Sequence, residues 1–153
     1  MALPLTGRYP VLLDKQGRIG VPAKVREAVG IGKDEEAHWF LSPGDEEGCL
    51  TLWPQAVFEN LAGKLPDAML PGAEQSRFER WYFSKTHQLR MDKQGRVVLP
   101  EDARTQASIA EELVLVGRRD RLQIWPKARW EEEEARMDRE CEQLREIGRK
   151  VLA

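Results

Sequence analysis

The chain of 153 residues contains 41% hydrophobic and 33% charged residues, a balance typical of a globular protein rather than a disordered or fibrous one. It has no apolar run near the roughly 20 residues of a transmembrane helix, and its first ten residues lack the apolar stretch of a signal peptide. Its two cysteines are too few for a disulfide framework or a four-cysteine zinc site. We therefore expect a cytoplasmic protein without membrane association, and the net charge of −2 by itself argues against a nucleic-acid ligand.

The charged residues are distributed unevenly along the chain. Five basic and two acidic side chains fall in residues 1–30, and seven basic and four acidic ones fall in residues 77–104. By contrast, residues 31–76 carry two basic and nine acidic side chains, and residues 131–153 carry five and eight. Because a local basic patch is what attracts nucleic acid, the two basic segments are candidates for such a patch.

In chain order, the first half is predicted to contain two hairpins and a short helix. Apolar residues alternate over 9–13, which predicts a strand, and Gln-Gly at 16–17 predicts a turn into a returning strand. A short helix is expected over 23–30, since a proline precedes it and a glycine ends it. A second hairpin is expected to join residues 38–41 to 49–53.

The second half of the chain repeats the first. Residues 13–26 read LDKQGRIGVPAKVR and residues 91–104 read MDKQGRVVLPEDAR, so DKQGR and the later proline and arginine recur at an offset of 78. LTLWP at 50–54 likewise matches LQIWP at 122–126. A half of this size buries little core by itself. We therefore expect the halves to pair about a pseudo-two-fold axis, with strands of one half completing the sheet of the other.

This organisation predicts four parts within an α+β fold that is mainly β. Residues 5–54 form the first domain, 55–84 a helical connector interrupted by prolines, 85–126 the second domain and 127–153 a C-terminal helix. Apolar residues in the last part lie near a heptad stripe, and Gly148 interrupts that stripe, which argues against a long coiled coil.

The repeated motif resembles that of the MraZ family, and the resemblance spans residues 5–140. Each copy is followed by a proline and an arginine (Asp14–Arg18 with Pro22 and Arg26; Asp92–Arg96 with Pro100 and Arg104). The resemblance implies two tandem AbrB-like β-hairpin/helix/β-hairpin units, packed as a swapped-hairpin double barrel with flanking helices. It also implies a sequence-specific regulator of transcription that binds double-stranded DNA upstream of the division and cell-wall operon. Such a regulator would associate with the nucleoid and form a homo-oligomeric ring on short G-rich direct repeats.

Basic side chains in and near the two motifs are the candidate DNA contacts. Arg18 and Arg96 come first, because a guanidinium can bind the O6 and N7 atoms of guanine as well as phosphate. The alternative interpretation is structural: each arginine pairs with the aspartate four positions earlier and locks the turn, and both roles can coexist. Candidate phosphate contacts, which set affinity and salt dependence, are Lys15, Lys24, Arg26 and Lys93.

No pattern in the sequence favours catalysis. The two histidines, His38 and His87, do not occupy equivalent positions in the repeat, and the sequence has no nucleophile elbow, Gly-rich phosphate loop or metal-ligand cluster. We expect no enzymatic activity and no cofactor, metal ion or small-molecule substrate.

A second class of function is also open from the sequence. Glutamine at 16 and 94 replaces a residue that is often basic in the MraZ family, and segments 31–76 and 131–153 are acidic. These features favour an oligomeric protein-interaction module, or an antitoxin-like protein of the AbrB fold, without specific operator recognition.

Overall fold

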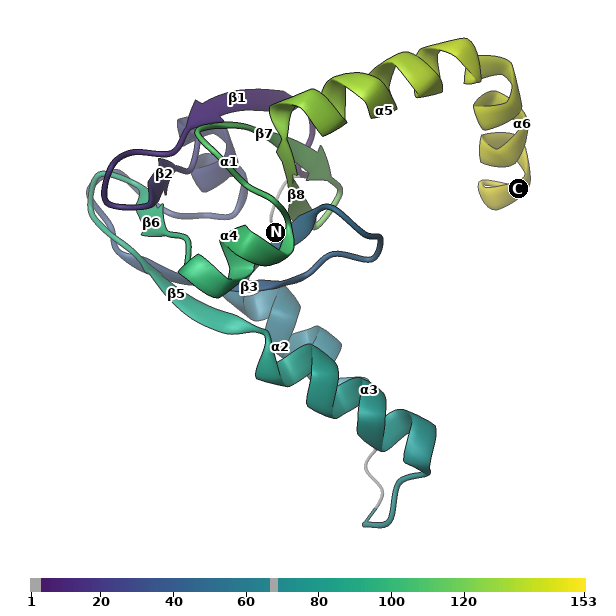
Figure 1. Ribbon diagram of the computed structural model, residues 1–153, viewed down its shortest axis with the longest axis horizontal. Helices are drawn as coiled ribbons and strands as arrows, with labels where there is room; N and C mark the ends of the chain where they lie inside the picture. Colours follow the sequence, from purple (N-terminus) through teal and green to yellow (C-terminus); the bar gives the residue numbers. More distant parts are fainter. Residues whose placement is uncertain (1–3, 67–68) are drawn as a thin grey trace.

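The fold is known from a computed structural model that describes residues 4–66 and 69–153. Six strands form an antiparallel sheet in the order β1-β7-β8-β4-β3-β5, and two short strands, β2 and β6, form a separate ribbon (Figure 1). The strands are β1 (Arg8–Leu12), β2 (Arg18–Gly20), β3 (Ala37–Pro43), β4 (Leu50–Pro54), β5 (His87–Met91), β6 (Arg96–Val98), β7 (Glu112–Arg118) and β8 (Arg121–Pro126). The helices are α1 (Ala23–Ala28), α2 (Gln55–Gly63), α3 (Ala73–Ser84), α4 (Glu101–Gln106), α5 (Lys127–Arg139) and α6 (Cys141–Val151).

The two halves of the chain exchange strands throughout the molecule. Strands β1 and β3 of the first half pair with β7 and β5 of the second, and β4 pairs with β8. The ribbon also takes one strand from each half, with Ile19 opposite Val97 at its centre. The expected pairing of strands between halves is therefore confirmed. Although a tight turn joins β1 to β2, each of these strands finds its partner in the other half, as a swapped-hairpin α+β fold requires.

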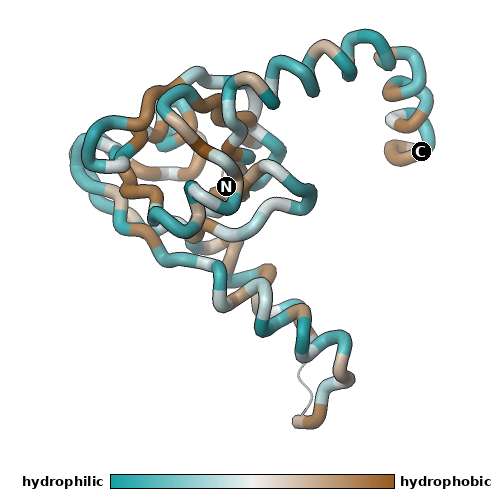
Figure 2. Tube along the Cα trace, in the orientation of Figure 1, coloured by the Kyte–Doolittle hydropathy of each residue, from teal (hydrophilic) through white to brown (hydrophobic). Residues whose placement is uncertain are grey.

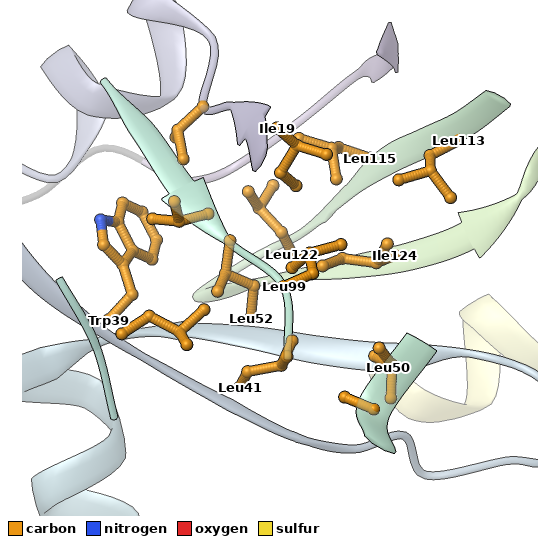
Figure 3. Close-up of a cluster of buried hydrophobic side chains, with 14 of the residues drawn as sticks. Ile19, Trp39, Leu41, Leu50, Leu52, Leu99, Leu113, Leu115, Leu122 and Ile124 are labelled. Carbon is orange, nitrogen blue, oxygen red and sulfur yellow. The ribbon is translucent and has the colours of Figure 1, made fainter. Parts of the chain in front are cut away.

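Side chains from both halves fill the main hydrophobic core (Figure 3). Along the trace, hydrophobic residues gather in the body formed by the strands (Figure 2). Trp39 and Leu52 of the first half and Leu115 and Ile124 of the second are fully buried, and Ile19 of the ribbon joins the same cluster at 1% exposure. Full burial of such a side chain contributes about 1.5–3 kcal/mol. Because the core is shared, neither half can be removed without exposing the other.

Two helices, α2 and α3, connect the halves of the chain. Helices α2 and α3 are separated near the prolines at 66 and 71, and residues 67 and 68 lie outside the described part of the chain. Aromatic rings attach this pair of helices to the sheet: Phe58 of α2 stacks on Phe40 of β3 at 4.6 Å between ring centroids. The hydroxyl of Tyr82 in α3 donates a hydrogen bond to Ser42 Oγ at 3.0 Å.

The C-terminal segment differs from the single helix expected over 127–153. It forms two helices, and the break falls at Glu140, whose φ of −101° and ψ of 16° leave the helical range. The N–H of Glu140 is shared between the carbonyls of Arg136 and Met137, at 3.0 and 3.2 Å, so the last turn of α5 tightens and the chain changes direction. Gly148 lies inside α6, since an interior glycine costs only about 1 kcal/mol.

Candidate nucleic-acid interface

The two copies of the motif form matching turns that an aspartate holds together. In the first copy, Asp14 Oδ1 accepts hydrogen bonds from the backbone N–H groups of Gln16 and Arg18, at 2.9 and 2.8 Å. Its Oδ2 accepts a bond from Arg18 Nε at 2.7 Å. Gly17, at a φ of +76°, donates its N–H to the Asp14 carbonyl and closes the turn. The expected aspartate–arginine lock is therefore present in the structure.

The second copy repeats these contacts almost atom for atom. Asp92 accepts the backbone N–H groups of Gln94 and Arg96, at 3.0 and 2.9 Å, and Arg96 Nε at 2.9 Å. In each turn the glutamine carbonyl lies 3.4 Å from an Nη2 atom of the arginine. The glutamine that departs from the family pattern thus takes part in holding the guanidinium, and each arginine is fixed before any ligand binds.

These hydrogen bonds predict how stability depends on pH at the second turn. The bond from the backbone N–H of Arg96 is the main cause that lowers the pKa of Asp92 below its ordinary value, which is about 3.9. A carboxylate with a lowered pKa in the folded state stabilises the fold above its unfolded-state pKa. That contribution is lost as the pH falls through the lowered folded-state value.

We therefore expect Asp92→Asn to lower the urea midpoint at neutral pH. The difference from the wild type should shrink as the pH falls from about 3.9 through the lowered folded-state pKa, below which the wild-type carboxylate is also neutral. Urea unfolding followed by circular dichroism across the acid range measures this difference. A difference that stays constant into strong acid would mean that the shape of the side chain, rather than its charge, holds the turn.

Each turn is covered by an arginine from the other half. Arg26 donates its Nε to the Val21 carbonyl at 3.0 Å, and its guanidinium lies so close to Gly95 that a β-carbon there would be 2.7 Å from Nε. Arg104 repeats the arrangement, with its Nε donating to the Leu99 carbonyl and its guanidinium beside Gly17. Arg104 was not among the sequence candidates, although its place in the repeat matches that of Arg26.

Lys24 is an exposed side chain of α1, the helix whose Arg26 reaches the second turn. Its equivalent in the second half is Asp102, which lies 2.9 Å from His87 Nε2 at the start of β5. The second turn instead follows the end of β5, so it lies one strand length away from His87. Since the halves fold alike, we expect exposed Lys24 to lie away from the turn of its own half.

The two turns lie at the two ends of the ribbon. The Leu99 N–H donates to the Gly17 carbonyl at 2.8 Å, and the Val21 N–H donates to the Gly95 carbonyl at 2.7 Å. Both turns lie on the left in Figure 1. We call this surface the motif face: residues 14–18 and 92–96, Gly20 and Val98 of the ribbon, and Arg26 and Arg104. Its cations outnumber its two carboxylates threefold, with exposed Lys15 and Lys93 at the tips of the turns.

The described residues offer no other obvious chemistry. No group of three or more potential metal-binding side chains occurs among residues 4–66 and 69–153. Within the same part of the chain, none of the helices combines the length and the apolar character needed to span a bilayer.

Two intertwined halves with the same aspartate-locked turn define a tandem protein of the AbrB-like swapped-hairpin class. The family model described as "MraZ protein, putative antitoxin-like" matches residues 82–149. Three similar curated relatives are each named "Transcriptional regulator MraZ". The Desulforamulus reducens protein is 32% identical over 140 residues, covering 92% of this chain and 94% of the relative. The Clostridium acetobutylicum protein is 32% identical over 145 residues, covering 93% of this chain and 97% of the relative. The Symbiobacterium thermophilum protein is 34% identical over 126 residues, covering 82% of this chain and 86% of the relative.

The chain therefore belongs to the MraZ family. The relatives are named as transcriptional regulators rather than enzymes, which agrees with the expectation that the chain has no enzymatic activity.

Proposed function

We propose that this chain regulates transcription by binding double-stranded DNA through its motif face. The observation that carries the proposal is the pair of arginines, Arg18 and Arg96, each held in one orientation by an aspartate and presented on a two-stranded ribbon. Each arginine commits Nε to its aspartate, which leaves terminal N–H groups for guanine O6 and N7 or for phosphate. Fixing the side chain in advance lowers the entropy cost of binding.

The size of the ribbon fits the major groove. At about 3.3 Å per residue, the four-residue span from Gly17 to Val21 separates the two turns by roughly 13 Å, and the major groove of B-DNA is about 12 Å wide and admits a two-stranded ribbon. In this arrangement Lys15 and Lys93 reach the phosphates on either side. Arg26 supports the second turn, and Lys24 of the same helix is a further phosphate contact.

We propose further that copies of the chain assemble through α6. Leu144, Ile147 and Val151 form an apolar stripe on this helix at 41%, 55% and 74% exposure. An apolar groove of about 410 Å³ lies between the α2–α3 pair and the sheet, and its walls include Leu61, Leu65, Phe78 and Trp81. Helix α6 and the α2–α3 pair lie far apart within one chain (Figure 1), so the stripe and the groove can meet only between copies.

The charges beside the groove also favour α6 of a neighbouring copy as its occupant. Beside Trp81, the loop between β3 and β4 carries Glu46 and Glu47, and Arg145 and Lys150 are basic side chains of α6. A contact between two different surfaces repeats head to tail and closes into a ring when the rotation allows. A ring repeats the motif face, so several weak contacts on direct repeats reinforce one another through effective concentration.

The test is a fluorescence-anisotropy titration at several salt concentrations. One duplex carries short G-rich direct repeats like those upstream of the division and cell-wall operon, and the control duplex has the same composition in scrambled order. We expect tighter binding to the repeats and a log affinity that falls linearly with log salt concentration. Equal affinity for the two duplexes at low salt would contradict operator recognition and favour an interaction module or an antitoxin-like protein. A fluorescent fusion that colocalises with the nucleoid would support the proposed location.

A further inference from the structure

One apolar side chain is exposed at the centre of the motif face. Val98 ends β6 and is 51% exposed, whereas its neighbours Val97 and Leu99 are fully buried. The alternation of a strand therefore directs Val98 to the outer side of the ribbon, the same side as Arg18 and Arg96. Val98 belongs to neither of the two hydrophobic clusters that the described residues form, so core packing does not explain a valine here.

The equivalent position in the other half holds a glycine. Gly20 is exposed, and a β-carbon added to it would meet no atom within 4 Å, so space does not require glycine. The register sets Val98 directly opposite Arg18, and Gly20 directly opposite Arg96. The outer side of the ribbon thus pairs one arginine with an isopropyl group and the other with bare backbone, which breaks the pseudo-two-fold symmetry where the two halves meet.

We propose that Val98 contacts the 5-methyl group of a thymine next to the base that Arg18 contacts. This inference rests on the proposed DNA-binding function. The thymine methyl is the apolar group that base pairs present in the major groove, and aliphatic side chains recognise it by contact. Side chains directly opposite on paired strands have β-carbons about 4.5–5.5 Å apart, so Val98 and Arg18 reach neighbouring groups in the groove.

The asymmetry also gives the ribbon a direction on DNA. A symmetric pair of readers matches a palindromic site, because operator symmetry mirrors protein symmetry. Here the half with Val98 and Arg18 reads an additional methyl group that the half with Gly20 and Arg96 does not read. Each copy of the chain therefore binds in one orientation, as successive direct repeats require.

The experiment first selects the preferred site from a random duplex library and then replaces each thymine of that site with deoxyuridine, which lacks only the methyl group. We expect the wild type to bind about four-fold more weakly when one particular thymine is replaced, because burial of one methyl-sized group contributes that amount. Val98→Gly and Val98→Ser are expected to bind the two duplexes equally. The ratio of the affinities for the thymine and deoxyuridine duplexes is measured within each variant, so a partly unfolded fraction of the protein does not change it.

Gly20→Val is the matched control. It adds the same side chain at the related position, so it should keep the wild-type thymine preference and gain a second one near the base that Arg96 contacts. Equal wild-type affinity for thymine and deoxyuridine at every position overturns the inference, as does a preference that survives in Val98→Gly, while operator binding itself stands. Failure of the library to enrich any sequence counts against the proposed function, and the inference falls with it.

Discussion

A chain with aspartate in place of both Leu144 and Ile147 is expected to be monomeric under conditions in which the wild type forms a ring. Each of these side chains contributes about 1.5–3 kcal/mol when it is buried against apolar surface, and a charge in its place must be desolvated. The loss of at least about 3 kcal/mol per contact corresponds to roughly 100-fold in the dissociation constant. Native mass spectrometry measures the change.

The control for this variant is Arg149→Asp, which changes the charge of α6 by the same amount on its polar side. It should assemble like the wild type. A ring that persists in the Leu144→Asp, Ile147→Asp chain would exclude α6 from the interface.

The groove is tested separately by Phe78→Asp, since Phe78 is 46% exposed at the groove wall. If the stripe of one copy binds the groove of the next, a mixture of the two defective chains should form a 1:1 dimer through the one intact contact.

The repeat made much of the fold and of the site predictable. Two identical pentapeptides adopt the same backbone, so the aspartate–arginine lock could be proposed for Arg18 and Arg96 together. The pairing between halves followed from a physical requirement, because either half alone has too little core. The repeat also points to Arg104, because Arg26, its equivalent in the first half, is a candidate contact.

The remaining differences come from tertiary structure. The charge of Lys24 and its closeness in sequence to the first motif make it a candidate, but the folded chain alone decides which surface a side chain of α1 reaches. Asp102 at the equivalent position lies beside His87, so Lys24 is expected to lie away from the turn of its own half, whereas Arg26 of the same helix reaches the second turn. The break at Glu140 also had no signal in the sequence, because neither glycine nor proline stands there.

Alanine at Gly95 is expected to destabilise the protein more than alanine at either of two other glycines with similar backbone. Gly17, Gly30 and Gly95 have φ values of +76°, +83° and +82°, and a residue with a β-carbon pays about 1–2 kcal/mol in this region. At Gly30 the added carbon meets no atom within 4 Å, and at Gly17 the nearest atom lies 3.5 Å away, an ordinary contact. Gly17→Ala and Gly30→Ala should therefore lower the free energy of unfolding only by this backbone cost.

At Gly95 the added carbon would lie 2.7 Å from Arg26 Nε, which donates to the Val21 carbonyl. The guanidinium must move and that hydrogen bond is lost, which adds about 1 kcal/mol. Free energies of unfolding from urea titrations of the three variants measure the difference. A double-mutant cycle with Arg26→Ala locates its cause, because the extra cost of Gly95→Ala should disappear once the arginine side chain is absent. If Gly95→Ala costs no more than Gly17→Ala, then Arg26 moves aside freely and does not hold the second turn in place.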